Sequence, residues 1–582
     1  FPTFRFSGVR TLRKMFYFKL ALSNVRRNRL THLPYLIATA VMSGVFLLIA
    51  GLLFSKSLTN TPSGNTASML FAFGLVVYAL FTFFFMMYIN NFLIKRRKKE
   101  FGLYGILGLD KRHIGRVLIW ENLFVIGGGL LCGVAVALVF GRLLFLILIK
   151  LIHAAPGSSF YIAPIAYLLM FGLFFVIFVV TNVINLVRIH TANPIALLSS
   201  EKRGEKDKKG LVPLAILGAL LLGTAYYFAW TADVPGFALG IFFPLAILVI
   251  LATYLLFLCG SIVILRLLRL KKSLYYKPDH FVTISGMFHR MRQNSRGLAT
   301  ICILSTMLVV TISGTLSLYL GREEMMKGMY PYDVQVTVPK ESTKEQIAVY
   351  DGVIQRLAAE HNVVLSADKS KLITELPEGE EIRHNNFVFE DSVFVEAPTL
   401  IFYDGSFRFD ASGSETDCLA FVQAMKDYQN PAVGDDSTLR VWDFFTARED
   451  GYGFYGGLLF LGAFFAVLFL AVAVLILYFK QVTEGYEDKE RFSILQQVGM
   501  DDHQVKKTIN RQVLWVFFLP LAATALHMLF ASKIMAQMLR TFMLYDWSLV
   551  LCCIGGSLGA FALLYFGVYW LTARTYYRIV HR

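Results

Sequence analysis

A short stretch of this chain occurs twice: residues 99–120 read KEFGLYGILGLDKRHIGRVLIW, and residues 489–515 read KERFSILQQVGMDDHQVKKTINRQVLW. When Phe101 is set on Phe492, the constant offset of 391 residues pairs a glycine with a glycine and an aspartate with an aspartate. Each copy predicts a short helix, because its apolar residues recur three and four positions apart. The duplication indicates that the chain contains two related halves.

The residues that end each predicted short helix are also shared. The glycine is expected at the left-handed cap of the helix, and the aspartate two positions later is expected to start the next helix by accepting backbone N–H bonds. These residues are Gly108 and Gly499, and Asp110 and Asp501. Two interpretations stay open on the residues alone: a re-used loop between apolar helices, or a pair of docking elements that face the cytoplasm.

The composition predicts a polytopic membrane protein. Of the 582 residues, 56% are hydrophobic and only 16% are charged, so the chain is far more apolar than an ordinary soluble protein. Ten apolar stretches reach the roughly 20 residues that cross a bilayer. They lie at residues 33–54, 68–94, 115–150, 160–187, 211–231, 237–268, 298–320, 455–480, 508–532 and 546–572.

The positions of lysine and arginine predict the orientation in the membrane. These residues cluster before the first span, after the second and fourth, between the sixth and seventh, and after the tenth. Ten alternating spans put all the clusters on one side, so both termini are expected in the cytoplasm. The net charge of +16 is therefore interpreted as a topology signal and a match for anionic membrane lipids, and no nucleic-acid partner is expected.

A second, weaker repeat supports the duplication. RRNRLTHLPYLIATAVMSG at residues 26–44 resembles RQNSRGLATICILSTMLVVTISG at residues 292–314, with Asn28 on Asn294 at an offset of 266. Because this offset is smaller than that of the first repeat, the second half must carry an insertion between its first and second spans. Spans one to four and seven to ten are predicted to form the two halves, and spans five and six an extra hairpin that joins them.

The chain is thus predicted to divide into six segments. They are a cytoplasmic N-terminal segment with an amphipathic helix from Met15 at residues 1–32, the first transmembrane half at 33–187, a linker with the fifth and sixth helices and a basic loop at 188–297, the seventh helix at 298–320, an extracellular domain at 321–452, and the eighth to tenth helices at 453–582.

The predicted extracellular domain is α+β. Strands are predicted for DVQVTV, SVFVEA and TLIFYDGSFRFD, and the last of these is a hairpin that turns at Asp404 and Gly405. Helices are predicted for TKEQIAVYDGVIQRLAAEH and SETDCLAFVQAMKDY. A capping box of Ser342 and Glu345 marks the start of the first helix. The segment holds 12 Lys and Arg against 25 Asp and Glu. This acidity serves either solubility or the recruitment of cationic peptides. The candidate recruiting residues are Glu378, Glu380, Glu381, Asp435 and Asp436.

No catalytic signature is found. The sequence has no G-x-x-x-x-G-K-[ST] loop, no H-E-x-x-H motif and no zinc-ligand spacing, so no enzyme activity, bound cofactor or metal is expected. GYGFYGG at residues 451–457 contains G-x-G-x-x-G, but without a βαβ unit it is interpreted as the closely packed start of a membrane helix. Glu121 is interpreted as a packing or interface group rather than a proton carrier. Asn182 and Asn185 are interpreted as interhelical hydrogen-bond donors, and Gly127, Gly128, Gly129 and Gly133 mainly as packing residues.

The architecture and several short motifs resemble a known family. Four features resemble the FtsX-type ABC transporter permeases: NPIALLSSEK at residues 193–202, the paired loops, the ten spans, and an outer domain placed only between the seventh and eighth spans. SRGLATICIL at residues 295–304 and TARTYYRIV at residues 572–580 are similar to patterns of the bacitracin-resistance (Bce-type) permeases.

The resemblance implies a mechanism of the mechanotransmission type. Two copies of a separate ATPase would bind ATP and Mg, press on the two short helices, and move the outer domain. The work would remove antimicrobial peptides from lipid-linked cell-wall precursors, and the permease would also signal to a membrane sensor histidine kinase. The implied ATPase-docking residues are Glu100, Phe101, Leu103, Tyr104, Leu107, Gly108, Glu490, Phe492, Ile494, Leu495, Val498 and Gly499.

Two other functions remain open. A membrane receptor or scaffold could sense a ligand for a sensor kinase without ATP-driven work. An ion-driven carrier is disfavoured, because the centres of the spans almost lack charged residues.

Overall fold

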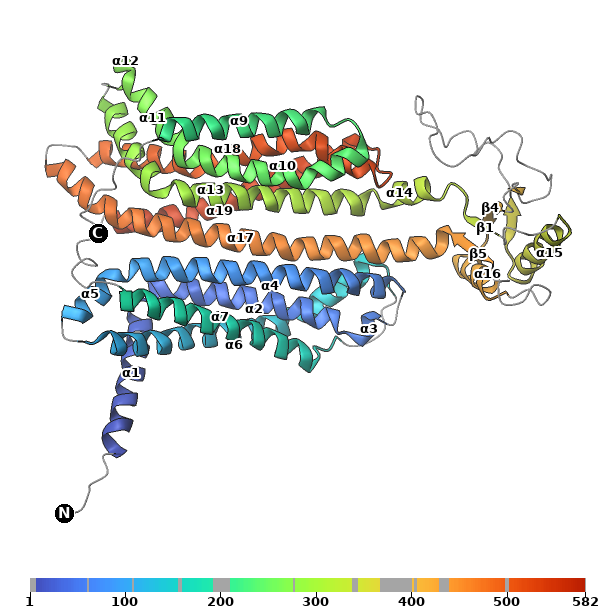
Figure 1. Ribbon diagram of the computed structural model, residues 1–582, viewed down its shortest axis with the longest axis horizontal. Coiled ribbons are helices and arrows are strands. Elements are labelled where there is room, and N and C mark those ends of the chain that lie inside the picture. Colours follow the sequence, from blue (N-terminus) through green and yellow to red (C-terminus); the bar gives the residue numbers. More distant parts are fainter. Residues whose placement is uncertain are drawn as a thin grey trace.

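The computed structural model describes residues 7–59, 62–106, 109–154, 160–191, 210–275, 278–337, 344–366, 400–401, 406–428, 439–497 and 502–580. Ten of the described helices are long and apolar enough to cross a bilayer, as the composition predicts. The helices form an elongated bundle, and a small sheet domain lies beyond one end of it (Figure 1). We call this the sheet end, and we call the opposite end, where α5 (Lys98–Ile106) lies, the α5 end.

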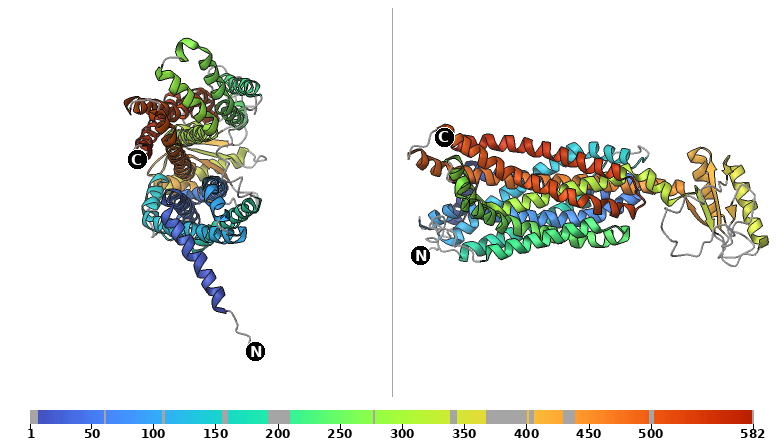
Figure 2. Two further views of the ribbon diagram at one scale, coloured as in Figure 1. Left: turned by 90° about the vertical axis from the view of Figure 1, so that its left-hand side faces the viewer. Right: turned by 90° about the horizontal axis from the view of Figure 1, so that it is seen from above.

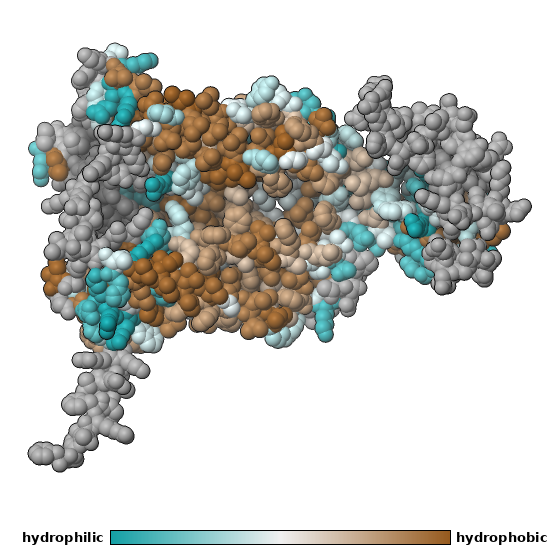
Figure 3. Space-filling view, in the orientation of Figure 1, coloured by the Kyte–Doolittle hydropathy of each residue, from teal (hydrophilic) through white to brown (hydrophobic). Residues whose placement is uncertain are grey.

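The surface of the bundle matches a membrane protein. Side chains between its two ends are mostly apolar on the face drawn in Figure 3, and hydrophilic residues gather toward the ends. Since apolar side chains at a lipid boundary need no burial inside the protein, the many exposed leucines and phenylalanines of the spans are consistent with a bilayer around them.

The first half of the bundle contains the helices that precede residue 192. They are α1 (Ser7–Arg27), α2 (Arg29–Leu53), α3 (Lys56–Thr59), α4 (Pro62–Arg96), α5, α6 (Lys111–Leu151) and α7 (Pro164–Thr191). α2 packs against α4 and α6, and a methyl group on Gly129 of α6 would meet Cβ of Thr39 at 2.5 Å. Gly129 therefore serves close packing, whereas a methyl group on Gly127 would meet nothing within 4 Å. α1 begins upstream of the expected Met15 and points away from the bundle (Figure 1).

The second half lies beside the first when the bundle is viewed along its length (Figure 2). Its long helices are α13 (Pro278–Leu320), α17 (Phe444–Gln497), α18 (Asp502–Arg540) and α19 (Trp547–Val580). The extra hairpin consists of α9 (Leu211–Thr231), α10 (Pro235–Leu255), the π-helical turn η1 (Leu256–Gly260), α11 (Ser261–Leu270) and α12 (Lys272–Tyr275). Because α9 and α10 pack on α18 and η1 packs on α13, the hairpin belongs in space to the second half.

α17 crosses the whole bundle without interruption. It begins at Phe444, directly after the strand β5 (Arg440–Asp443), and continues for 54 residues to Gln497. At a rise of 1.5 Å per residue, such a helix is about 80 Å long. The sequence predicted a helix start at the glycines of GYGFYGG, but these glycines lie inside α17, about two to three and a half turns after its first residue.

The glycines of α17 bring the two halves together at the sheet end. A methyl group on Gly456 would meet the carbonyl oxygen of Leu151, in α6, at 2.8 Å, and one on Gly453 would overlap the backbone of Ser63 in α4. Only a residue without a side chain fits so close an approach of two helix backbones. The predicted close packing at this motif is therefore present, between helices of different halves.

Aromatic contacts continue this interface toward the α5 end. Rings of α4 meet rings of α17 at centroid distances between 4.7 and 6.2 Å. The pairs are Phe71 with Phe460, Tyr78 with Phe465, Phe81 with Phe465 and Phe469, and Phe92 with Phe479. α4 and α17 are thus parallel neighbours that join the halves along their length.

The domain at the sheet end is α+β, as predicted. Its described elements are α14 (Arg322–Met329), β1 (Val334–Thr337), α15 (Lys344–Glu360), β2 (Val364–Ser366), β3 (Leu400–Ile401), β4 (Ser406–Ser412), α16 (Glu415–Asp427) and β5. The strands pair antiparallel in the order β2-β4-β1-β5, with β3 on β4.

The core of this domain follows from strand alternation. Val334 and Val336 of β1 pair with Phe409 and Phe407 of β4, and all four side chains are buried with residues of α15 and α16. Alternate residues of a strand point to the same face, so the helices cover one face of the sheet. The predicted strand SVFVEA, the turn at Asp404 and the capping residue Ser342 lie outside the described residues.

Candidate functional site

The first copy of the repeated stretch forms α5, a short helix between α4 and α6. Phe101 is buried among Ile94, Ile114, Leu118 and Ile189, so it anchors the helix to the bundle. On the outside of the helix, Leu103 is 52% and Ile106 is 60% exposed. The surface that α5 offers to a partner therefore includes Leu103 and Ile106, and the second of these was not among the predicted docking residues.

A buried ion pair lies directly beneath α5. Arg97, at the junction of α4 and α5, bonds both carboxylate oxygens of Glu121 in α6, one of them through Nη2 at 3.1 Å. Both side chains are almost fully buried. The Nδ2 amide of Asn24, from α1, also donates to Glu121 Oε1 at 2.8 Å. Glu121 thus joins three helices, which matches the packing role predicted for it.

The same arginine holds the short helix itself. Arg97 Nε donates to Glu100 Oε2 of α5 at 2.9 Å, and its guanidinium lies over the Phe101 ring at 5.2 Å from the ring centroid. Asn28 Nδ2 donates to the other oxygen of Glu100 at 3.0 Å. Burial by itself would lower the pKa of Arg97, but the carboxylates of Glu121 and Glu100 outweigh this effect and raise the pKa above its ordinary value. Arg97 therefore stays charged and ties α5 to the bundle.

The second half contains an equivalent buried cluster with its charges exchanged. Arg290 of α13 bonds Asp488 of α17 through Nη2, and its Nη1 lies 3.7 Å from Glu484 Oε2. At the two repeat offsets, Arg290 occupies the position of Asn24, and Asp488 the position of Arg97. Each half therefore places a buried arginine–carboxylate pair under its copy of the repeat, but the second half draws the cation from the opposite helix.

The second copy of the repeat is built differently from the first. Its beginning, residues 489–497, is the end of α17 itself, and Ile494 there is 60% exposed. Glu490, Phe492 and Leu495 belong to the same helix, and their side chains are not among those described. In the first half, by contrast, the equivalent helix α4 ends at Arg96 before α5 begins.

The remaining predicted site residues fall into three groups. Tyr104 of α5 is half-buried, and its hydroxyl oxygen accepts from Asn24 Nδ2 of α1 at 3.3 Å. Asp110 is the N-cap residue of α6, as predicted, but its carboxylate accepts no capping hydrogen bond; its backbone oxygen accepts from His113 and Ile114. The others lie outside the described residues: Leu107, Gly108, Val498, Gly499 and Asp501 of the repeats, and Glu378, Glu380, Glu381, Asp435 and Asp436 of the sheet domain.

Polar contacts inside the first half agree in part with the sequence prediction. Asn185 of α7 donates to Asn90 Oδ1 of α4 and accepts from Asn90 Nδ2, both at 2.9 Å. Asn182 is instead an acceptor between helices, from Asn122 of α6 at 3.0 Å, because its own amide donates to Phe178 O one turn earlier in α7. Amide pairs therefore join α7 to α4 and to α6, in addition to the ion pairs of Arg97.

Several residues of the site were not singled out by sequence reasoning. They are Asn24, Asn28, Arg97, Arg290 and Asp488. All five occur in charged or polar stretches, in which the basic residues were already explained by the orientation of the spans. The signal that could have found them is the repeat itself: Asn24 and Arg97 align with Arg290 and Asp488, so a polar pair at these positions is present in both halves.

Comparison with known sequences matches both halves to the same family. The sequence pattern of the family described as FtsX-like permease C-terminal matches residues 72–194 and, a second time, residues 463–577. The first match includes most of α4 and all of α5, α6 and α7, and the second includes most of α17, all of α18 and most of α19. The duplication predicted from the repeated stretch is therefore present as two family matches.

Similar proteins cover most of the chain. The ABC transporter permease YvcS of Bacillus subtilis (strain 168) is 23% identical over 613 aligned positions, which span 90% of this chain and 94% of YvcS. The ABC transporter permease protein YxdM of the same organism is 21% identical, over 90% of this chain and 94% of YxdM. Its bacitracin export permease protein BceB is 21% identical, over 90% of this chain and 96% of BceB.

Proposed function

We propose that this chain, an ABC transporter permease of the FtsX type, transmits the ATP-driven closure of a separate ATPase dimer through its helices to the sheet domain. Each half carries one FtsX-like segment and one copy of the repeated stretch. Exposed apolar side chains on both copies, Leu103 and Ile106 of α5 and Ile494 of α17, are suited to contact a partner. One permease would thus engage two identical ATPase subunits, which supply the ATP and Mg sites.

The proposed orientation places the α5 end in the cytoplasm and the sheet domain, with residues 321–452, outside the cell. The basic residues that precede α2 and follow α4 lie at the α5 end, and lysine and arginine favour the cytoplasmic side of a membrane. An ATPase that needs cellular ATP would then meet α5 and the end of α17.

The continuity of α17 is the observation that carries this proposal. The helix starts at β5 of the sheet domain and ends in the second copy of the repeat, so a displacement of one end is passed along a rigid element of about 80 Å. Near the start of α17, Arg448 lies 3.7 Å from Glu323 of α14 and 3.4 Å from Glu415 of α16. These ion pairs join α14 and α16 of the sheet domain to the first turns of α17.

The proposed substrates are cell-wall-directed antimicrobial peptides, as the name of the similar bacitracin export permease suggests. The permease would remove such a peptide, or a peptide–lipid complex, and so give resistance, and it would report the peptide to a membrane sensor histidine kinase. The acidic residues Glu378, Glu380 and Glu381, with Asp435 and Asp436, would raise the local concentration of cationic peptides by long-range attraction.

A kink in α17 tests the proposal. The permease is co-purified with its ATPase in lipid nanodiscs, and ATP hydrolysis is measured with and without bacitracin. Glu449→Pro breaks the helix between the sheet domain and the bundle, because proline lacks the N–H that bonds one turn back, while the control Glu449→Ala keeps the helix. We expect Glu449→Pro to abolish peptide stimulation and to leave basal hydrolysis unchanged. Full stimulation in this variant would contradict transmission through α17.

A second pair of variants separates the proposal from a receptor that works without ATP. Leu103→Glu and Ile494→Glu place a charge on the two exposed contact surfaces and should lower ATPase co-purification, whereas Val364→Glu, at an exposed apolar position in β2, should not. If all three variants retain the ATPase, or if the wild-type chain never binds it, a kinase-coupled receptor explains the chain better.

A further inference from the structure

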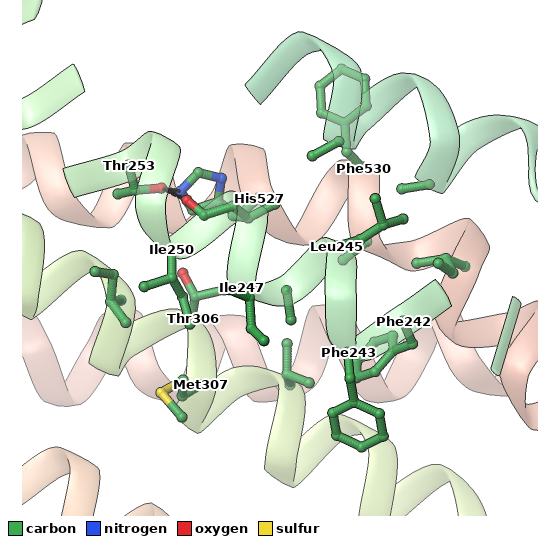
Figure 4. Close-up of a pocket in the computed structure, with 18 of the residues that line it drawn as sticks. Phe242, Phe243, Leu245, Ile247, Ile250, Thr253, Thr306, Met307, His527 and Phe530 are labelled. Atoms are coloured by element: carbon green, nitrogen blue, oxygen red, sulfur yellow. Dashed lines mark hydrogen bonds between the residues drawn. The ribbon is translucent and has the colours of Figure 1, made fainter. Parts of the chain in front are cut away.

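A partly open apolar pocket lies between the extra hairpin and the second half. It measures about 360 Å³ and is lined by α9, α10, α13 and α18. Phe242, Ile247, Ile250, Met307 and Phe530 supply much of its wall (Figure 4). Pockets of this size and apolarity commonly hold small ligands, and this one lies among membrane spans, where hydrocarbon chains are the available neighbours.

Three polar side chains of this wall, those of Thr253, His527 and Tyr226, form one hydrogen-bonded chain. Thr253 donates its hydroxyl hydrogen to Val249 O at 2.6 Å, so it accepts from Nε2 of His527 at 3.0 Å. Nδ1 of the same ring then accepts from the Tyr226 hydroxyl at 2.6 Å. A neutral ring meets all three requirements. Since no Asp, Glu, Lys or Arg is among the described residues lining this space, it suits a hydrocarbon chain and not a charged group.

A second pocket, of about 280 Å³, lies between α9, α18 and α19, nearer the sheet end. Trp230, Lys533, Ala536, Gln537, Arg540 and Trp547 line it. Lys533 pairs with Asp233 at 2.7 Å, whereas the guanidinium of Arg540 has no ion-pair partner among the described residues. Tryptophan together with lysine or arginine is typical of the level at which lipid headgroups lie.

Gln537 is an independent sign that the second pocket binds a ligand. The side chain is only 9% exposed, and its Oε1 has no hydrogen-bond partner among the described residues. A buried amide oxygen without a partner destabilises the protein unless a ligand or water satisfies it. Because the amide can be turned about its axis, either the oxygen or the NH₂ group can face a ligand there.

The two pockets are continuous in position along α18 and α9. Ile534 lines the apolar pocket and its neighbour Lys533 the basic one, and in α9 the same holds for Ala229 and Trp230. They are therefore less than one helical turn, about 5.4 Å, apart along these helices. A molecule with an apolar chain and a charged head would reach both.

We propose that these two pockets form one binding site for a membrane lipid with an anionic phosphate headgroup. The hydrocarbon chain occupies the space between α9, α10, α13 and α18, and the phosphate lies along α18 against Arg540, Gln537 and Lys533. Charge complementarity selects this lipid: both cations of the basic pocket lie toward the sheet end of α18, and Arg540 has no counter-ion among the described residues. The site is separate from both repeat copies, and it does not depend on the proposed peptide substrates.

Lipid titration of the purified full-length permease tests the site. Binding is followed by native mass spectrometry with phosphatidylglycerol and with phosphatidylcholine of identical acyl chains. We expect the wild-type chain to bind phosphatidylglycerol roughly tenfold more tightly, the ratio that one charge contact of about 1.4 kcal/mol gives. Lys533→Gln with Arg540→Gln should remove this preference. Equal affinity for the two lipids in the wild-type chain would overturn the proposal.

Two further variants test the specificity of the site and the position of the chain. Lys150→Gln removes an exposed cation at the sheet end of the first half, away from both pockets, and should leave the preference intact; an equal loss there would mean only general charge attraction. Ala531→Phe fills the apolar pocket and should weaken the binding of both lipids to this site. Unchanged binding in Ala531→Phe would overturn the assignment of the hydrocarbon chain.

Discussion

The ion pair under α5 allows a direct test of how the short helix is held. Arg97→Met removes the cation from between Glu121 and Glu100 and leaves Glu121, only 1% exposed, with the Asn24 amide as its remaining described partner. Removing one member of a buried ion pair typically costs about 3–5 kcal/mol. The bond from Arg97 to the half-exposed Glu100 adds about 1 kcal/mol or less. We therefore expect the local opening free energy of α5 to fall by at least about 3 kcal/mol.

Hydrogen exchange measures this opening. A loss of about 3 kcal/mol makes amide exchange roughly a hundredfold faster when it proceeds through local opening. Mass spectrometry of peptides from residues 98–106 should show this acceleration in Arg97→Met, while the end of α17 stays unchanged. Arg112→Met, which removes an exposed arginine from the first turn of α6, is the matched control and should exchange like the wild-type chain. Unchanged exchange in α5 of Arg97→Met would refute the role of the ion pair.

The exchanged charges of the second half provide a rescue. A triple variant with Asn24→Arg, Arg97→Asp and Glu121→Gln gives the first half the arrangement found at Arg290 and Asp488. The triple variant restores the buried pair with its cation on the other helix, so amide exchange in residues 98–106 should return most of the way to the wild-type rate. Arg97→Asp alone should accelerate this exchange more than Arg97→Met does. A triple variant no better than Arg97→Asp would show that the two clusters are not equivalent.

Three other predictions concern assembly and coupling. The mass of the purified complex should correspond to one permease and two ATPase subunits, because one chain carries both copies of the repeat; two permeases per ATPase dimer would contradict this. Gly453→Val should separate the two halves at the sheet end, because the added side chain overlaps Ser63, and should lower the melting temperature of the chain by several degrees. Gly555→Ala should not, because a methyl group there meets nothing within 4 Å. Gly108→Val and Gly499→Val should each abolish peptide-stimulated ATP hydrolysis at normal membrane abundance, because valine disfavours the left-handed cap expected there; unchanged hydrolysis would argue against the repeats as couplers.

Hydrophobic patterning was enough to predict the ten spans and the α+β character of the sheet domain. A membrane span needs only length and apolarity, and both can be read locally. Boundaries were less certain where helices extend beyond the bilayer: α17 starts at Phe444, inside the segment assigned to the outer domain, because nothing in a solvated helix marks where the membrane begins. The glycines at residues 451–457 illustrate the difficulty, since close packing was predicted but not the helix on which they pack.

The candidate site could be predicted only in part. The repeat identified the position of the short helix α5, but the second short helix that it predicted is instead the end of α17. It also could not distinguish anchoring from exposed side chains, since Phe101 proved to be an anchor while Ile106 is exposed. That distinction depends on which face of α5 meets α4, α6 and α7. A helix of nine residues has too few turns for its periodicity to define a face by itself.

The sequence by itself determined the membrane class, the number of spans, the duplication and the position of the inserted domain, because each of these follows from composition, length or an offset along the chain. Tertiary structure alone decided that Arg97 meets Glu121 and Arg290 meets Asp488, that the extra hairpin packs on the second half, and that two pockets meet along α18. The physical reason is that partners such as Arg290 and Asp488 are separated by 198 positions, and only the packing of helices against one another brings their side chains within bonding distance.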